Sequence, residues 1–441
     1  MSANNLSTRG AEASESSSER NLRWNVSSNL YHPDSNPDGY ISLGIAENAL
    51  MHDELLKFLN SKSIISSALL FTYGDGPYGS KRITDAFAGL LNNWFKPSRP
   101  VVKEHIMVTN GVTSAIEHLA WALANPGESI LLGRPYYRNF LPDISLRFGV
   151  EVVSVSFGPG EIDPFGVNAA KKYEEALEES KKRGVKIRAL LICNPHNPLG
   201  RCYSREILVE LMKFCQKYRI HLISDEIYAL SVWKNQVDAA KDPAEGAGEG
   251  FSSVLSIDPT GIIDPCLVHV LWGTSKDFGA NGIRLGVLIS QAAPKLLDAC
   301  KTCGLYSSPS SFAENAAIEI FNNEKFVEDY VRSNRERLSE AHRYAIERLK
   351  EHGIEYTTGI NAGLFLWIDL GKAWREKHPE EIEGLGCTSD SVIFGKLMAE
   401  KVYLVRGDEA GAEEAGWFRL VFSQPREIVD EGIKRMVRAL Q

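Results

Sequence analysis

The chain has 441 residues, of which 44% are hydrophobic and 24% are charged, which is typical of soluble globular proteins. Its formal net charge of -8 argues against a nucleic-acid-binding protein, because such proteins carry a basic surface. The sequence contains no apolar run of about 18 residues, so we expect no transmembrane helix and no membrane partner.

The first residues, MSANNLSTRGAEASESSSER, are rich in Ser and Glu and have almost nothing to bury. We therefore predict a disordered tail over residues 1–22, and no secretory signal, because an apolar segment is missing. The seven cysteines are an odd number in a chain without a signal, which favours reduced thiols and a cytoplasmic protein. The sequence has a single CxxC motif, at 300–303, and its histidines show no ligand spacing, so no metal site is predicted.

From residue 105 onward, short apolar segments alternate with helical patterns. Seven segments are predicted strands: HIMVTNG, SILLGRP, GVEVVSVSF, RALLICNP, HLISDEIY, CLVHVLW and LGVLIS. Helices are predicted from Thr113 to about Ala124, over KKYEEALEESKKRG, and over REILVELMKFCQKY, which Ser204 caps. This alternation predicts an α/β fold with a mostly parallel sheet of seven strands, covered by helices on both faces.

After residue 320 the pattern changes to long helices, such as NEKFVEDYVRSNRERLSEAHRYAIERLKEHG, and to the strands NAGLFLWIDL and WFRLVFS. We predict a large domain over 71–325, a smaller α+β domain over 326–441, and an N-terminal segment over 23–70 that associates with the small domain. The acidic, Gly-rich stretch at 241–250 is predicted to be an exposed insertion loop.

Polar side chains follow the ends of several predicted strands, where ligands bind in parallel sheets. Gly111-Val112-Thr113 opens a helix and suits a phosphate, although glycine before a helix is common. NPHNPLG, at 194–200, is explained by a turn alone. Asp225 ends a buried strand, where its carboxylate needs a partner or forms a structural ion pair. LWGTSKDFGANGIRLG, at 271–286, is explained by a polar loop after a strand.

One cofactor, pyridoxal 5'-phosphate, accounts for all of these features together. It requires a lysine amine for a Schiff base and a carboxylate facing its pyridine nitrogen. It also requires donors near its phenolic oxygen, and a phosphate site made of backbone N–H groups, a hydroxyl and an arginine. The chain supplies each group at the end of a different predicted strand.

The sequence also resembles the fold type I pyridoxal-phosphate enzymes of the class I/II aminotransferase superfamily. Within that group it is most similar to 1-aminocyclopropane-1-carboxylate (ACC) synthases and ACC-synthase-like proteins. The resemblance runs from about residue 38 to the end of the chain. Its strongest motifs are GIAENAL, NPHNPLG, SDEIY, SKDFGANGIRLG, NAGLFLWIDL and GWFRLVF.

The resemblance implies a role for each residue that matches the family's cofactor site. Lys276 would form the Schiff base and move the substrate's α-proton. Asp225 would pair with the pyridine nitrogen. Asn197 and Tyr228 would donate to the phenolic oxygen, and Tyr137 would stack on the ring, although a plain core aromatic also explains Tyr137.

The resemblance also implies a phosphate site, a substrate site and a partner subunit. The residues that would hold the phosphate are Gly111, at the start of a predicted helix, and Val112, Thr113, Ser275 and Arg284. Arg419 would bind the substrate's α-carboxylate, and Ala46 and Glu47 would cover the amino-acid end. The implied assembly is a homodimer with shared active sites, which a tyrosine of the partner enters; Tyr73 is our choice over Tyr78.

Two features depart from the family pattern. Gly273 stands three residues before Lys276, where the family often has a serine, so one phosphate contact is expected to be lost or replaced. RGDEAGAEEAGWFR, which precedes and includes Arg419, is longer and more acidic than the corresponding segment of ACC synthases. Because that segment lies near the substrate's side chain, it leaves the identity of the substrate open.

The residues predict a small-molecule amino-acid substrate but leave open transamination, loss of a group at Cβ, and ring closure at Cγ. The leading interpretation is a lyase that breaks a C–S bond in S-adenosylmethionine or a cysteine S-conjugate, because Glu47 could face a sulfonium. The alternative is an aminotransferase, which uses the same residues. A non-catalytic regulator is a remote alternative, since the N-terminal tail is too short for a DNA-binding domain and Lys276, Asp225 and Arg419 are all present.

Overall fold

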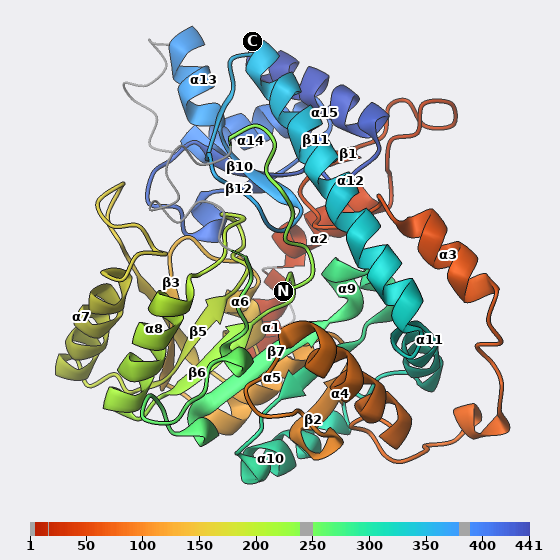
Figure 1. Ribbon diagram of the computed structural model, residues 1–441. Helices are drawn as coiled ribbons and strands as arrows, with labels where there is room; N and C mark the ends of the chain where they lie inside the picture. The colour runs from red at the N-terminus through yellow and green to blue at the C-terminus, as the bar shows by residue number, and fades with distance from the viewer. Residues whose placement is uncertain (1–4, 16, 239–249, 379–388) are drawn as a thin grey trace.

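A seven-stranded sheet forms the centre of the larger domain in the computed structural model, which describes residues 5–15, 17–238, 250–378 and 389–441 (Figure 1). The strand order is β2-β8-β7-β6-β5-β3-β4. β8 runs antiparallel to its neighbours β2 and β7, and the other pairs are parallel. The predicted mostly parallel sheet is confirmed. Its strands are β2 (Ile106–Thr109), β3 (Ser129–Gly133), β4 (Glu151–Val155), β5 (Ile187–Cys193), β6 (His221–Asp225), β7 (Val268–Gly273) and β8 (Gly286–Ile289).

Helices cover both faces of this sheet because successive strand residues point to opposite sides. Leu191 and Ile223 belong to one apolar core together with α5 (Val112–Leu123) and α6 (Phe140–Ser145). Leu190 and Leu222, their neighbours in sequence, belong to a second core with α4 (Lys81–Phe95), α7 (Ala169–Lys182) and α8 (Arg205–Tyr218). α10 (Pro294–Gly304) packs on α5, and α11 (Ser311–Phe321) packs on α4.

The smaller domain contains the antiparallel sheet β12-β13-β10-β9 and the parallel pair β1-β11. The strands are β1 (Ile41–Ser42), β9 (Glu355–Tyr356), β10 (Phe365–Asp369), β11 (Val402–Tyr403), β12 (Val405–Arg406) and β13 (Trp417–Val421). The helices are α12 (Glu324–Glu351), α13 (Leu370–Lys377), α14 (Ser389–Ala399) and α15 (Arg426–Ala439). β1 joins the N-terminal segment to this domain, whereas α3 (His52–Asn60) packs on α11. The domain boundaries stay a prediction.

The N-terminal segment differs from the predicted disordered tail. The structure has two helices there, α1 (Thr8–Glu15) and α2 (Ser17–Ser27). The hydroxyl of Ser7 accepts a hydrogen bond from the backbone N–H of Gly10 and so caps α1, while Val26 near the end of α2 is completely buried. Local capping and this one anchor supply the order that the composition did not predict. Residues 241–249 of the predicted insertion loop lie outside the described residues.

The described ranges contain no helix with the length and apolar character needed to cross a bilayer. Within the same ranges, no group of three or more His, Cys, Asp and Glu side chains is arranged to hold a metal ion. The cysteines of these ranges are free thiols.

Candidate active site

The ends of the central strands bring together chain segments that lie far apart in the sequence. Cys193 at the end of β5 pairs with Asp225 at the end of β6, which in turn pairs with Leu271 of β7. Because β8 is antiparallel, its first residue Gly286 pairs with Thr109 at the end of β2 and with Gly273 at the end of β7. The polar loops that follow these strands therefore meet along one edge of the sheet.

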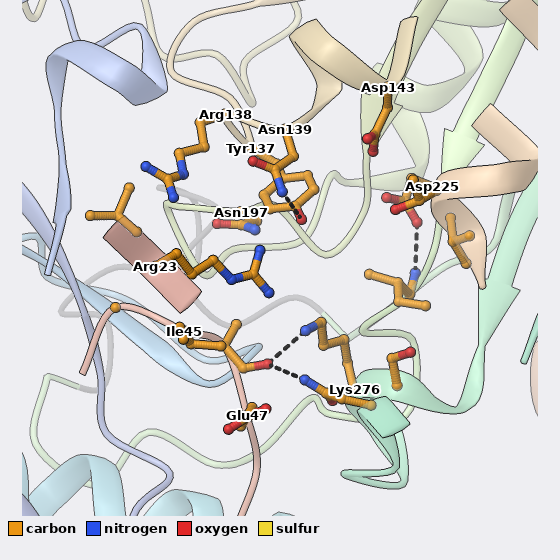
Figure 2. Close-up of a pocket in the computed structure, with 18 of the residues that line it drawn as sticks. Arg23, Ile45, Glu47, Tyr137, Arg138, Asn139, Asp143, Asn197, Asp225 and Lys276 are labelled. Carbon is orange, nitrogen blue, oxygen red and sulfur yellow. Dashed lines mark hydrogen bonds between the residues drawn. The ribbon is translucent and has the colours of Figure 1, made fainter. Parts of the chain in front are cut away.

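A cavity of about 540 Å³ opens at this edge, between the two domains (Figure 2). Twelve predicted site residues line it: Ala46, Glu47, Val112, Thr113, Tyr137, Asn197, Asp225, Tyr228, Ser275, Lys276, Arg284 and Arg419. Gly111 lies immediately beside the lining as the N-cap of α5. Tyr73 does not line the cavity of its own chain, and its side chain is fully exposed to solvent.

Lys276 lies on α9 (Thr274–Asp277), a single helical turn that directly follows β7. Its Nζ donates a hydrogen bond to the carbonyl oxygen of Ala46 at 2.6 Å, as Figure 2 shows. Burial, together with the positive charge of Arg419, lowers the pKa of Lys276 to about 7. An amine with this pKa is partly neutral at physiological pH, so it can both attack a carbonyl and accept a proton.

Asp225 ends β6 and points into the same cavity (Figure 2). Its Oδ1 accepts a hydrogen bond from the backbone N–H of Ile227 at 3.2 Å. Burial raises the pKa of Asp225 to about 7, although the charge of Lys276 opposes the shift. A cationic group placed beside this carboxyl would restore its negative charge, because an opposite charge lowers the pKa of an acid.

Three glycines shape the wall at the N-terminus of α5. Gly111 has φ of 77°, and a Cβ there would lie 2.3 Å from Nη2 of Arg284. A Cβ on Gly286 would lie 2.6 Å from the backbone nitrogen of Val112, and one on Gly273 would lie 2.6 Å from the carbonyl oxygen of Leu285. The backbones therefore approach too closely for side chains. This close packing explains the glycine at position 273, because a serine would not fit there unless the backbone moved.

Arg419 lies in the middle of β13 and connects the small domain to the loop after β5. Its Nη1 donates to Oδ1 of Asn197 at 2.8 Å, and its Nη2 donates to the carbonyl oxygen of Gly44 at 2.7 Å. The guanidinium lies 5.2 Å from the ring centre of Phe365. Its buried Nε has no hydrogen-bond partner in the described residues. Arg419 is therefore held rigidly and keeps a donor for an anion that enters the cavity.

Two tyrosines complete the wall around Lys276 and Asp225. The hydroxyl of Tyr137 accepts a hydrogen bond from Nδ2 of Asn139 at 3.1 Å. The ring of Tyr228 packs edge-on against Phe365, with 5.4 Å between the ring centres. Burial raises the pKa of both tyrosines, so both hydroxyls stay protonated and able to donate hydrogen bonds.

Several lining residues were not predicted from the sequence: Arg23, Trp24, Arg138, Asn139, Asp143, Asn281 and Tyr403. Burial raises the pKa of Asp143 to about 7, although a hydrogen bond with Thr113 opposes the shift. Arg138 and Asn139 follow directly on Tyr137, so their position beside a predicted ring contact was a usable signal. No local pattern marks Arg23, which reaches the cavity from α2.

The acidic segment before Arg419 fastens the small domain to the large one. Glu409 forms an ion pair with Arg138, whose Nη2 also donates to the hydroxyl of Tyr403 at 2.9 Å. The carbonyl oxygen of Ala410 accepts from the backbone N–H of Tyr136 at 2.7 Å, and Glu413 accepts from the N–H of Phe157 at 3.0 Å. These contacts join the segment before Arg419 to the larger domain near Arg138.

Comparisons with known proteins agree on the family and on the fold. Residues 46–436 match the family described as aminotransferase class I and II. The probable aminotransferase sirI of Leptosphaeria maculans is 33% identical, and the alignment covers 93% of this chain and 94% of that protein. The 1-aminocyclopropane-1-carboxylate synthase-like protein 1 of Bos taurus is 31% identical, over 93% of this chain and 78% of its own. The solved aspartate aminotransferase of Thermus thermophilus has a similar fold, with a TM-score of 0.73 at 20% identity, over 99% of this chain and 100% of its own.

Proposed function

This chain belongs to the aminotransferase class I and II family, whose members use pyridoxal 5'-phosphate, and from that premise we propose its reaction. It is an aminotransferase that moves the amino group of an α-amino acid to a 2-oxo acid. The proposal rests above all on the convergence of Lys276, Asp225 and Arg419 on one cavity of about 540 Å³. A cavity of this size accommodates a cofactor together with a small substrate.

The phosphate of the cofactor fits the N-terminus of α5. Free backbone N–H groups and the positive end of the helix dipole favour an anion there. Val112 and Thr113 supply the N–H groups, and Ser275 and Arg284 add a hydroxyl and a guanidinium. The glycine at position 111 supports this assignment, because a side chain there would occupy the space in front of Arg284.

The aromatic ring of the cofactor fits between the remaining polar groups. Asp225 balances the charge of a protonated pyridine nitrogen, which accounts for an otherwise costly buried carboxyl. Asn197 and Tyr228 would donate to the phenolic oxygen, and Tyr137 would stack on the ring.

The reaction then follows from what the side chains can do. When bound, the cofactor supplies an electron sink for the charge left as a bond to the substrate's Cα breaks. Lys276 attaches the cofactor and, once released from it, moves the proton at Cα. Arg419 binds the α-carboxylate and so orients the Cα–H bond towards Lys276. Ala46 and Glu47 cover the amino-acid end and limit the access of water.

Transamination is favoured over cleavage of a C–S bond by two observations. A relative that aligns over 94% of its own length is named a probable aminotransferase. A sulfonium in the cavity would also be repelled by the positive charge of Arg23, which lines the same cavity as Lys276. The second candidate is a lyase acting on S-adenosylmethionine or a cysteine S-conjugate. Exposed Glu47 at the cavity wall favours it, since that carboxylate suits a sulfonium.

Incubation with three sets of substrates tests the proposed reaction. The purified protein is given a panel of amino acids with 2-oxoglutarate, S-adenosylmethionine alone, or a cysteine S-conjugate alone, and the products are identified by mass spectrometry. We expect glutamate and new 2-oxo acids from the first set only. Release of the sulfur group from either of the other substrates, without transfer of the amino group, would contradict the proposed transamination and support the lyase reaction.

Arg419→Ala is expected to lower kcat/KM for every amino acid through a higher KM. The loss of a buried, charge-assisted contact with the α-carboxylate should cost about 2–4 kcal/mol. Cofactor affinity should change little, and Arg426→Ala, an exposed arginine of the same domain, is the matched control. If the variant loses cofactor while its KM stays the same, Arg419 does not bind the substrate's carboxylate.

The proposed assembly is a homodimer that shares its active sites. Apolar side chains lie exposed on the segment 64–73, at the end of α10 and at the start of α11. They are Ile65, Leu69, Phe71, Tyr73, Leu305, Tyr306 and Phe312. Soluble monomers rarely expose a large contiguous apolar patch, so this surface favours contact with another chain. The rings of Phe71 and Phe312 contact each other across this surface, with 5.8 Å between their centres. We propose that a second copy covers this surface and that the Tyr73 of each copy enters the cavity of the other.

Mixing two inactive variants tests whether Tyr73 crosses between subunits. We expect Tyr73→Phe and Lys276→Ala dimers to regain activity after subunit exchange, because one site of each hybrid then has both residues intact. About a quarter of all sites should recover in a symmetric dimer with random exchange. Mixing Lys276→Ala with Asp225→Asn is the control, because both residues lie in the cavity of one chain. No recovery after proven exchange would remove Tyr73 from the partner's site.

A further inference from the structure

Helix α2 places Arg23 at the wall of the cavity, next to residues of both domains. In Figure 2 its guanidinium lies between Asn197 and Lys276. α2 packs against β1, Val26 is its buried anchor, and the hydroxyl of Ser27 donates to the carbonyl oxygen of Arg23. The position of Arg23 is therefore fixed by the fold around it.

Arg23 differs from the other cations of the cavity because it lacks a partner among the described residues. Lys276 donates to Ala46, Arg284 donates to the carbonyl oxygen of Asn281, and Arg138 pairs with Glu409. Among the described residues, Arg23 forms no ion pair with a carboxylate, and its buried Nε has no hydrogen-bond partner. Its guanidinium lies 4.8 Å from the centre of the Trp24 ring. A partly buried guanidinium in this state favours an incoming anion.

The other anions expected in the cavity already have their own groups. The phosphate lies at the N-terminus of α5 with Arg284, and the α-carboxylate lies at Arg419, on the assignments of the proposed function. Glu47 is exposed and so is a weak partner for Arg23. The anion still to be accounted for is one on the part of the substrate beyond Cβ.

We infer that Arg23 binds an anionic group at the far end of the substrate, so that the substrates are acidic amino acids and the corresponding 2-oxo diacids. A planar guanidinium forms two parallel hydrogen bonds with a carboxylate and selects it over a neutral side chain. Arg23 thus determines substrate specificity, and it comes from α2 rather than from the edge of the central sheet. This inference rests on the proposed function.

Binding of two unreactive acids to the holoenzyme tests the inference without turnover. Succinate and butyrate have the same number of carbons, but only succinate carries a second carboxylate. Their dissociation constants are measured from the change in cofactor absorbance and by calorimetry. We expect the wild type to bind succinate more tightly than butyrate. Arg23→Gln should raise the dissociation constant of succinate by about 10- to 100-fold, while that of butyrate should change by less than about twofold. Arg23→Lys should fall in between.

Arg9→Gln is the matched control, because Arg9 lies on the preceding helix and contacts the carbonyl oxygen of Arg147 outside the cavity lining. It should bind both acids as the wild type does. Turnover should separate in the same way: Arg23→Gln should lose kcat/KM for aspartate and glutamate but keep it for alanine.

Two outcomes would overturn the inference. One is a wild type that binds succinate no more tightly than butyrate. The other is an Arg23→Gln variant that loses the cofactor or weakens both acids equally, which would assign Arg23 to the cofactor or the α-carboxylate. A wild type that binds succinate through Arg23 but transaminates no amino acid would contradict the proposed function and leave the anion site standing.

Discussion

Replacing Lys276 by alanine is expected to lower turnover by several orders of magnitude, while the protein still folds and still binds the cofactor. Alanine removes both the amine that attaches the cofactor and the group that moves the proton at Cα. The phosphate site at the N-terminus of α5 and the carboxyl of Asp225 remain, so non-covalent binding should persist. Steady-state kinetics and the absorbance spectrum of the dialysed protein measure the two effects separately.

Lys276→Arg provides the control for this prediction. It keeps a positive charge near the carbonyl of Ala46 but cannot form the covalent attachment, because a guanidinium stays protonated at neutral pH. The arginine variant should be as inactive as the alanine variant. Turnover near the wild-type level in either variant would remove Lys276 from the reaction.

Asp225→Asn is expected to lower kcat by at least about a hundredfold, because an amide of the same shape cannot stabilise a cationic pyridine nitrogen. The folded structure should be kept. Burial raises the pKa of Asp225 to about 7 even though the nearby charge of Lys276 opposes the shift, so a neutral side chain is compatible with these surroundings. Turnover and the thermal midpoint, both measured with saturating cofactor, separate a chemical defect from a structural one.

Glu226→Gln is the matched control for Asp225, since Glu226 is the adjacent buried carboxyl. It accepts hydrogen bonds from the hydroxyl of Ser224 and from the backbone N–H of Val254, and it does not line the cavity. Burial raises its pKa to about 8, so an amide resembles its protonated form. This variant should keep its kcat. If it lost as much activity as Asp225→Asn, the loss in both variants would reflect a disturbance of the end of β6 rather than the role proposed for Asp225.

The candidate site was largely predictable because its residues follow buried strands. Lys276, Asp225 and Asn197 each come directly after an apolar segment, and the carboxyl ends of parallel strands meet at one edge. The reversed direction of β8 was not predictable, because LGVLIS has the same composition as a parallel strand. It matters to the site, since it brings Arg284 to the edge at which the other strands end.

The parts that sequence reasoning missed depend on contacts between distant segments. The acidic residues before Arg419 suggested a substrate contact, yet Glu409 pairs with Arg138 and holds the domains together. The composition of the N-terminus predicted disorder over 1–22, whereas its helices carry Arg23 to the cavity. Tyr73 stays a prediction for a different reason: a residue that completes a partner's site makes no contact with the cavity of its own chain.

The attachment point of the cofactor tests the central claim most directly. The purified protein is treated with borohydride, which reduces the bond between cofactor and lysine, then digested, and the modified peptide is sequenced by mass spectrometry. We expect loss of the visible absorbance and a single modified residue, Lys276, in the peptide that follows β7. A cofactor fixed on another lysine, or a protein that binds no cofactor when Lys276, Asp225 and Arg419 are intact, would contradict this claim.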